Sequence, residues 1–258
     1  MKSFTTAISL LSILPVPERW TRNISSSTIY FPLAGMIIGA IYYLISIGLI
    51  RAGIQDQWLT IAVLTAMIVL TRAFHMDGLA DMADGFWGGS TKEQILRIMK
   101  DSATGVFGVI ALVILLLTKW TSLNFLIKGN TFWILISAAM VSRFSMVVLS
   151  GWLPYARKEG TGHAIISHTT WKHVFISLAY FVPLMLFIFG PGSLVLILIG
   201  ALVSGIIGYF SRIKISGVTG DVLGATCEIV ETLLLAITPF LQSYFFPDYW
   251  VSPLLVYI

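Results

Sequence analysis

The sequence predicts an all-α polytopic membrane protein, and three observations support this fold class. Hydrophobic residues make up 57% of the 258 positions, charged residues only 11%, and the mean hydropathy is +0.90. Apolar runs of about 17–20 residues recur along the chain, and a helix of that length crosses the hydrocarbon core of a bilayer. These runs do not alternate polar and apolar residues as the strands of a transmembrane barrel do. We therefore expect a single membrane domain, residues 1–258, built as a bundle of helices.

The bundle should contain about seven spans, with six and eight as the neighbouring alternatives. The apolar runs place these spans at about residues 30–50, 57–74, 104–119, 132–152, 174–190, 193–211 and 225–245. Phe4–Leu14 is apolar but too short to span, so we expect it at the membrane interface or in a re-entrant position. It lacks a small-residue cleavage site, so we expect it to be retained. Phe246–Ile258 is short and interrupted by proline, and we do not expect it to span.

The basic residues predict which side of the membrane each loop occupies, because cytoplasmic loops carry an excess of Lys and Arg. Most of the 16 basic residues fall on one side: Lys2, Arg19, Arg22, Arg72, Lys92, Arg97, Lys100, Arg157, Lys158, Lys172, Arg212 and Lys214. The other side receives Arg51, Lys119 and Lys128, while Arg143 falls inside a helix. We expect the first side to be cytoplasmic. This topology also explains the net charge of +4 without a nucleic-acid partner.

The most informative stretch is HMDGLADMADGFWGG, which begins at His75 where a long apolar run ends. It places Asp77, Asp81 and Asp84 four and three residues apart, so the three carboxylates share one face of a helix. Like charges on one stripe repel each other, and a cation between them removes that repulsion. Together with the neighbouring glycines, this pattern favours a divalent-metal site that a phosphorylated substrate can approach closely. The alternative is a solvated helix end whose acids point at water.

A second acidic cluster lies near the start of the last span. Asp221 and Glu228 are seven residues apart and share a helix face, and Glu231 lies one turn beyond Glu228. We expect all three at the cytoplasmic face or in the first turns beneath it. An unpaired charge among apolar residues there costs roughly 2–3 kcal/mol or more, so each glutamate needs a partner or a proton. The alternative, a helix-start acid favoured by the helix dipole, suits Asp221 better than Glu231.

Basic and small residues accompany both clusters. Arg97, Lys100, Asp101 and Ser102 precede a helix start that contains Gly105 and Gly108, and this arrangement suits a bound phosphate. The same basic residues also have a purely topological explanation. Arg157 lies in a loop of similar content. Arg143 lies deep in a span, where an arginine is expected to face the bundle interior and pair with a carboxylate.

These features admit three kinds of chemistry. The first is a metal-dependent transferase that acts on a phosphoanhydride, with Mg²⁺ neutralising charge on the leaving group. The second is an intramembrane prenyltransferase, which also uses Mg²⁺ on a diphosphate. The third is a cation- or proton-coupled transporter, whose acids would line a pathway near the bilayer midplane. Acids crowded at one membrane face favour chemistry supplied from the cytoplasm, but carboxylate spacing does not separate the first two.

Several motifs together resemble the cobalamin synthase family, adenosylcobinamide-GDP ribazoletransferase. They occur through nearly the whole chain and in the family's order: Leu14-Pro-Val-Pro17, His75-Met-Asp77-Gly-Leu-Ala-Asp81-Met-Ala-Asp84-Gly85, Arg97-Ile-Met-Lys100-Asp101-Ser102, Ser142-Arg143, Pro154-Tyr-Ala-Arg157 with Glu159-Gly160, and Gly217-Val-Thr-Gly220-Asp221-Val-Leu-Gly224 with Glu228 and Glu231. A histidine followed by three aspartates at this spacing is not generic membrane sequence. No acid of the motifs is missing.

The resemblance implies the last step in assembling the nucleotide loop of cobalamin. The family joins adenosylcobinamide-GDP to α-ribazole or its 5′-phosphate, giving adenosylcobalamin or its 5′-phosphate and GMP. It implies a Mg²⁺-dependent, multi-pass enzyme of the inner membrane with a cytoplasmic active site, and it is compatible with an association with other enzymes of the pathway.

Roles for single residues follow as hypotheses. Asp77, Asp81 and Asp84 would hold one or two Mg²⁺ ions on the pyrophosphate, and Asp221, Glu228 and Glu231 would complete the metal ligands. One of the acids of the second cluster, Asp84 or His75 would accept the proton of the ribose hydroxyl. The candidate substrate contacts are Arg97, Lys100, Asp101, Ser102, Arg143 and Arg157.

Overall fold

The computed structural model describes residues 2–246 apart from 18, 20, 22, 23, 25, 130 and 161, and the side chains of residues 128 and 243 are also outside the description. Within that part of the chain every regular element is a helix and there is no β-strand, which confirms the predicted all-α class. The expectations for Arg22 and for residues 247–258 lie outside the described residues.

Six long helices are apolar enough to cross a membrane: α2 Phe31–Arg51, α6 Val106–Lys128, α7 Ile134–Trp152, α9 Trp171–Phe189, α10 Ser193–Ile215 and α11 Gly220–Phe245. A further pair, α3 Asp56–Leu70 and α4 Phe74–Gly88, is bent by 83° and passes the same test only as one broken span. The described chain therefore contains six spanning helices, or up to seven with the bent pair. This result confirms the predicted polytopic bundle.

The break between α3 and α4 corrects the expected continuous helix over 57–74. α3 ends at Leu70, and Arg72 and Ala73 adopt left-handed backbone conformations with φ of 56° and 53°. Residues other than glycine adopt this backbone conformation at an energetic cost, so packing of the surrounding helices must maintain it. The turn ends the apolar run before His75 and starts a new helix there, so α4 takes a direction of its own.

Two other helices are longer than expected. α6 continues to Lys128 rather than ending near 119, and α11 begins at Gly220 rather than near 225. α11 begins there because Thr219 caps it, its hydroxyl accepting a hydrogen bond from the Val222 amide at 3.3 Å. These two shifts move charged side chains into the membrane-spanning part of the bundle.

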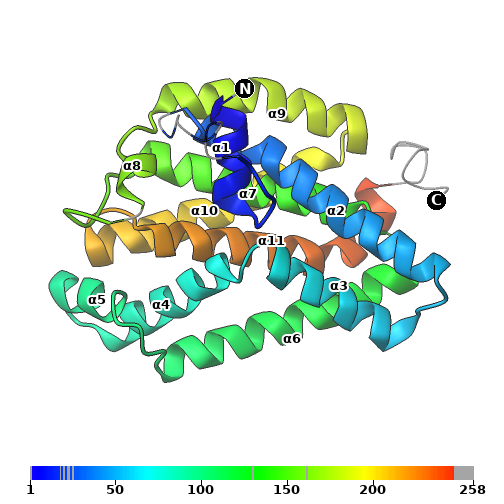
Figure 1. Ribbon diagram of the computed structural model, residues 1–258, viewed down its shortest axis with the longest axis horizontal. Coiled ribbons are helices and arrows are strands. Elements are labelled where there is room, and N and C mark those ends of the chain that lie inside the picture. The colour runs from blue at the N-terminus through cyan, green and yellow to red at the C-terminus, as the bar shows by residue number, and fades with distance from the viewer. Residues whose placement is uncertain are drawn as a thin grey trace.

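α7 and α11 run through the middle of the bundle, with α9 along one side and α6 along the other (Figure 1). α7 is the most enclosed of the spanning helices, since 89% of the residues in its most apolar stretch are buried. α2 packs closely on α7 because Gly35 and Gly39 leave room for its backbone. A Cβ at Gly39 would lie 2.6 Å from the Cα of Ile136. Small residues at such crossings are typical of membrane helix packing.

Four short helices complete the described chain: α1 Lys2–Leu11, η2 Thr28–Tyr30, α5 Lys92–Ile98 and α8 His163–Ile166. α1 lies across the long helices and packs on α2 and η2 (Figure 1). Its ten residues are too few to span, as expected for the N-terminal segment. α5, α8 and the α10–α11 turn gather at one end of the bundle (Figure 1), and the polar motifs around Arg97, Arg157 and Asp221 lie at this end.

Candidate active site

The three aspartates of the first motif lie on α4 as predicted, but their environments differ. Asp77 is exposed, Asp81 is half-buried and Asp84 is buried. Because α4 is one helix over all three positions, offsets of four and seven residues place them on one face, and both of the others repel the Asp81 carboxylate. Exposure falls from the first aspartate to the last.

The start of α11 adds a fourth carboxylate to this group. Gly78 lies against the backbone of Asp221, where a Cβ would come within 2.8 Å of the Asp221 carbonyl oxygen. This close approach brings the Asp221 carboxylate into the field of Asp77 and Asp81. We call Asp77, Asp81 and Asp221 the acid cluster. The sequence assigned its members to two separate acidic groups, and helix packing at a glycine brings them together.

Asp84 differs from the acid cluster because its carboxylate is bonded to the start of another helix. Its carboxylate oxygens accept hydrogen bonds from the backbone amides of Gly105 at 2.7 Å and Gly108 at 2.9 Å. These amides are the unpaired donors at the start of α6, which favour a negative charge. A Cβ at Gly105 would lie 2.5 Å from an Asp84 oxygen, so the glycines allow the carboxylate to approach. The anion at this helix start is thus Asp84 itself and not the phosphate that the glycines and basic residues suggested.

Arg157 connects three segments at this end of the bundle. Its guanidinium donates to Asp221 at 2.8 Å and to the Met99 carbonyl oxygen after α5 at 3.2 Å. The Thr219 hydroxyl also donates to Asp221, at 3.2 Å. The Arg157 and Asp221 side chains remain 19% and 21% exposed, so water and small ligands can reach the pair. Arg157 therefore neutralises part of the acid cluster and remains available to an anion.

The loop that carries Arg157 is held to the start of α11 by backbone contacts. The Ala156 amide donates to the Val218 carbonyl oxygen, and the Val218 amide donates to the Pro154 carbonyl oxygen, both at 2.9 Å. Burial raises the pKa of Tyr155 above its usual value, while Arg157 nearby opposes that shift. The phenol of Tyr155 is therefore protonated at neutral pH. This loop and the helix start form one unit that orients Arg157.

The other predicted substrate contacts lie at the same end but remain open to solvent. Arg97, Lys100, Asp101 and Ser102 are all exposed on α5 and the segment after it. Asp101 accepts a hydrogen bond from the Ala103 amide at 3.0 Å, which shapes the turn into α6. Arg97 and Lys100 are exposed cations of this segment, and their contact with substrate remains a prediction.

Glu228 and Glu231 do not belong to this surface, contrary to their expected place in the first turns under the membrane face. They follow Gly220 by eight and eleven residues, which is roughly 12 and 16 Å along α11. Both are almost fully buried. Lys119 donates to Glu228 at 2.6 Å and to Glu231 at 3.1 Å, and Arg143 pairs with Glu231. We call these four residues the buried ion network.

The buried ion network answers one sequence prediction and corrects another. Arg143 pairs with a carboxylate inside the bundle, as expected, and the partner is Glu231. Its 1% exposure and its ion pair account for its position without a bound substrate. Lys119 was expected at the outer boundary, but it lies inside α6 and is buried. A helix from Val106 that ended at Lys119 would be too short to span the membrane. That length could have indicated from the sequence that the helix continues past Lys119.

His75 also lies apart from the acid cluster. Two residues before Asp77, it projects from the other side of α4, where Gly224 of α11 packs against its backbone. It is 1% exposed, and neither ring nitrogen has a hydrogen-bond partner in the described part of the protein. A role as proton acceptor for the acid cluster would require it to act from the opposite face of the helix.

The acid cluster fits a magnesium ion in chemistry and charge. Among the residues that the structure describes, no three His, Cys, Asp or Glu side chains already converge on a metal position. Mg²⁺ usually takes one or two protein carboxylates and completes its shell with water and substrate phosphates, so a full protein cage is not required. Asp77 and Asp81 have no ion-pair or hydrogen-bond partner among the described residues, and Asp81 lies in the field of three other carboxylates, which Arg157 offsets only in part. Oxygen ligands with an excess of negative charge are suitable for this ion.

Fold and site define the class: a polytopic helical membrane protein with carboxylates and basic residues gathered at one end of the bundle. Within that class, the chain belongs to the cobalamin-5-phosphate synthase family, whose model matches residues 3–238. This membership confirms the resemblance drawn from the motifs and identifies the chain as an enzyme of cobalamin synthesis.

Named relatives match along almost their whole length. The proteins called adenosylcobinamide-GDP ribazoletransferase in Chlorobaculum tepidum, Chlorobium chlorochromatii and Syntrophobacter fumaroxidans are 38%, 40% and 37% identical to this chain. The alignments cover 90%, 88% and 90% of this chain and 92%, 91% and 96% of the relatives. No solved structure matches the chain.

Proposed function

We propose that this protein is a Mg²⁺-dependent transferase that joins adenosylcobinamide-GDP to α-ribazole or its 5′-phosphate. The products are GMP and adenosylcobalamin or its 5′-phosphate. The family and the names of the relatives support the reaction class. The structural observation that carries the proposal is the acid cluster, in which α4 and α11 bring Asp77, Asp81 and Asp221 together beside Arg157.

The reaction exchanges one phosphorus–oxygen bond for another. A ribose hydroxyl oxygen of the acceptor attacks the phosphorus on the cobinamide side of the pyrophosphate. The bond from that phosphorus to GMP breaks, GMP leaves with the electron pair, and the hydroxyl proton passes to a base. Mg²⁺, when bound, would neutralise the charge that builds up on the pyrophosphate oxygens. Asp77 and Asp81 are the residues that would hold it.

Among the candidate bases, Asp221 is best placed to accept the proton. Asp84 is buried with both oxygens bonded to amides of α6. Glu228 and Glu231 are paired with cations inside the bundle. His75 projects from the other side of α4. Asp221 is partly exposed within the acid cluster, and Arg157 orients its carboxylate at 2.8 Å.

Arg157, Arg97 and Lys100 are the cations that would bind the phosphate groups of the donor. Arg157 is partly exposed and fixed by its loop, and the other two are exposed at the same end of the bundle. A planar guanidinium suits phosphate oxygens because it can donate two parallel hydrogen bonds. The excess of basic residues at this end favours a cytoplasmic orientation, in which both soluble substrates reach the site from the cytoplasm.

The direct test is an assay on purified, detergent-solubilised protein. Adenosylcobinamide-GDP and α-ribazole 5′-phosphate are supplied with Mg²⁺ or with EDTA, and GMP and the corrinoid product are followed together. We expect equal amounts of both products with Mg²⁺ and neither with EDTA. Full turnover in EDTA would refute the metal dependence. Absence of both products in a protein shown to be folded would refute the transferase assignment, and a prenyl diphosphate would be the next substrate tested.

A further inference from the structure

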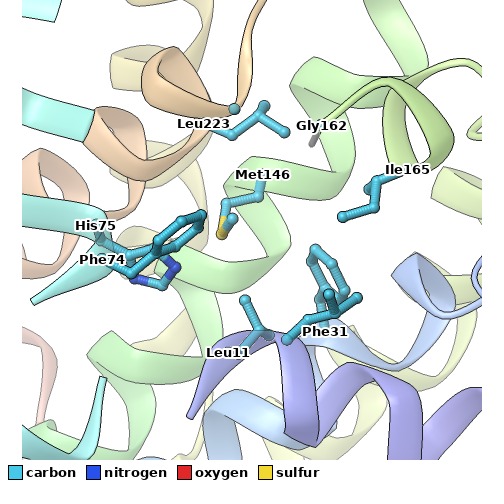
Figure 2. A pocket seen from close by; sticks show the side chains of 10 residues that line it. Leu11, Phe31, Phe74, His75, Met146, Gly162, Ile165 and Leu223 are labelled. Atoms are coloured by element: carbon cyan, nitrogen blue, oxygen red, sulfur yellow. The ribbon is translucent and has the colours of Figure 1, made fainter. Parts of the chain in front are cut away.

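An apolar cavity of about 100 Å³ lies beside the start of α4 and the start of α11 (Figure 2). Its walls come from α1, α2, α4, α7, α8 and α11, and include Leu11, Phe31, Phe74, Met146 and Leu223. A water molecule needs only about 10–15 Å³ of such a volume, so the cavity can hold a larger group. It is partly open to the outside of the bundle, since Phe74 on its rim is 54% exposed.

Among the described residues that line this cavity, His75 is the one whose side chain carries nitrogen or oxygen. Figure 2 shows its ring beside Phe74 at one side of the cavity, with Leu11 and Phe31 across from them. Both ring nitrogens are buried without a hydrogen-bond partner in the described residues. A buried polar group left without a partner costs about 1–3 kcal/mol, and in native proteins it usually indicates a missing water, ion or ligand.

The packing holds His75 in place although the imidazole has no partner. Gly224 of α11 lies against its backbone, where a Cβ would come within 3.1 Å of the His75 Cα. The break at Arg72 and Ala73 starts α4 directly before it. The backbone at His75 is therefore fixed from two directions while its ring faces the cavity. A fixed donor in an apolar pocket is suited to orient a ligand.

The chemistry of the cavity selects one type of ligand group. One nitrogen partner among apolar walls matches a flat, largely hydrocarbon ring system that carries a single free ring nitrogen. Guanine does not fit, because its several donors and acceptors would be buried without partners. The corrin macrocycle with its amide side chains is far too large for about 100 Å³.

We infer that this cavity binds the base of the acceptor nucleoside, with a His75 N–H donating to the free ring nitrogen. This inference rests on the proposed function, because the base of α-ribazole is a dimethylbenzimidazole. That base has a benzene ring, two methyl groups and one ring nitrogen that is not attached to the ribose. The cavity and the acid cluster flank the same turns: His75 precedes Asp77 on α4 by two residues, and Leu223 follows Asp221 on α11 by two. His75 then binds the acceptor nucleoside and does not take the proton from its ribose hydroxyl.

The test compares two acceptors in two proteins. The acceptors are α-ribazole and its indole analogue, in which a C–H group replaces the free ring nitrogen. The proteins are the wild type and His75→Phe, which removes the donor and keeps a ring in place. In the wild type the analogue should have a KM about tenfold higher, as expected for one lost hydrogen bond. In His75→Phe, α-ribazole should show the same rise, the two acceptors should become equivalent, and the KM for adenosylcobinamide-GDP should not change.

A proton-transfer role for His75 would give a different result. It would lower kcat with both acceptors and leave their KM ratio as in the wild type, and that outcome would overturn the inference. His75→Phe should fold, because it removes a buried polar group that has no partner. Met146→Trp is a second variant that fills the cavity and should raise the KM of the acceptor alone. His168→Phe is the matched control, since His168 is exposed and lies outside the cavity.

Equilibrium dialysis with free 5,6-dimethylbenzimidazole separates this inference from the proposed function, since it needs neither Mg²⁺ nor turnover. The wild type and His168→Phe should bind the base, and His75→Phe should bind it about tenfold more weakly. Binding to the wild type without turnover in the assay would support the cavity and refute the transferase. Turnover without binding, or a lipid chain that occupies the cavity and is not displaced by the base, would refute the cavity assignment alone.

Discussion

The acid cluster and the buried ion network use the same residue types on neighbouring helices, and their charges are balanced in opposite ways. In the network, Lys119 and Arg143 face Glu228 and Glu231, so two cations neutralise two carboxylates. The acid cluster has three carboxylates, and among the described residues one cation, Arg157, forms an ion pair with it, through Asp221. The network is almost fully buried, whereas the cluster is partly exposed.

This difference separates a structural use of charge from a binding use. A charge inside a membrane bundle is tolerated when it is paired, so the network connects α6, α7 and α11 without leaving a net charge in the interior. Uncompensated carboxylates at an accessible position keep their affinity for a cation from solution. Both groups are present on α11, separated by about two helical turns. Depth in the bundle and the number of facing cations therefore distinguish the two roles, although the residue types are the same.

The largest effect should come from breaking the buried ion network. Arg143→Met leaves Glu231 with Lys119, which Glu228 also requires. Removal of one partner of a buried pair typically costs about 3–5 kcal/mol, so we expect a loss of this size in the free energy of unfolding. The measurement is chemical unfolding in detergent. The double variant Arg143→Met/Glu231→Met should recover most of the lost stability because it leaves no unpaired charge. A single variant as stable as the wild type would show that Arg143 has another role.

Asp81→Asn should lower turnover without lowering stability. Expressed as free energy, this effect should be smaller than the stability loss in Arg143→Met. Loss of a metal ligand should reduce product formation about 100-fold or more, because the ion no longer neutralises charge on the pyrophosphate. The thermal midpoint should stay the same or rise, since the neutral amide relieves repulsion from Asp77 and Asp221.

Asp56→Asn is the control for that prediction, because Asp56 is exposed at the start of α3, outside both groups. It should leave turnover unchanged and lower the midpoint only slightly, because its charge lies at the exposed start of α3. If Asp81→Asn kept near-normal turnover, the metal role of Asp81 would be abandoned. If it lost turnover together with stability, the acid cluster would be a structural group like the buried network.

The helical class, the approximate number of spans and the common helix face of Asp77 and Asp81 could be predicted from sequence, because each depends on local patterns. The place of Asp221 beside them depends on packing at Gly78. Apolar runs reveal spans, and an offset of four residues places Asp77 and Asp81 on one helix face. The break after Leu70 could not be predicted. Neither Arg72 nor Ala73 signals a left-handed conformation, so packing between helices determines it.

The pairing of charges was equally out of reach of sequence patterns. Lys119 was taken as the end of its span, because a lysine usually marks the membrane boundary. Its two glutamate partners follow more than a hundred residues later, and helix packing alone brings them together. The role of Asp84 was missed for a similar reason, since the amides that it accepts from belong to another helix.

The smallest effect should separate Asp84 from the aspartates that precede it. Asp84→Asn keeps an acceptor oxygen but loses the charge that favours the amides at the start of α6, so we expect a loss of about 1 kcal/mol in stability. Turnover should fall by less than about tenfold, since α6 shifts only slightly. The Mg²⁺ concentration for half-maximal rate should stay at the wild-type value, whereas in Asp81→Asn it should rise.

The variants Asp81→Asn and Asp84→Asn carry the same substitution one helical turn apart, so comparing them shows whether Asp84 binds metal or serves the structure. A large loss of turnover in Asp84→Asn with a raised Mg²⁺ requirement would move Asp84 into the acid cluster. Its bonds to Gly105 and Gly108 would then position a metal ligand. A loss of stability without a change in Mg²⁺ requirement would leave Asp77 and Asp81 as the metal-binding residues. In that case the charge of Asp84 serves the start of α6, as the charges of the buried network serve the interior.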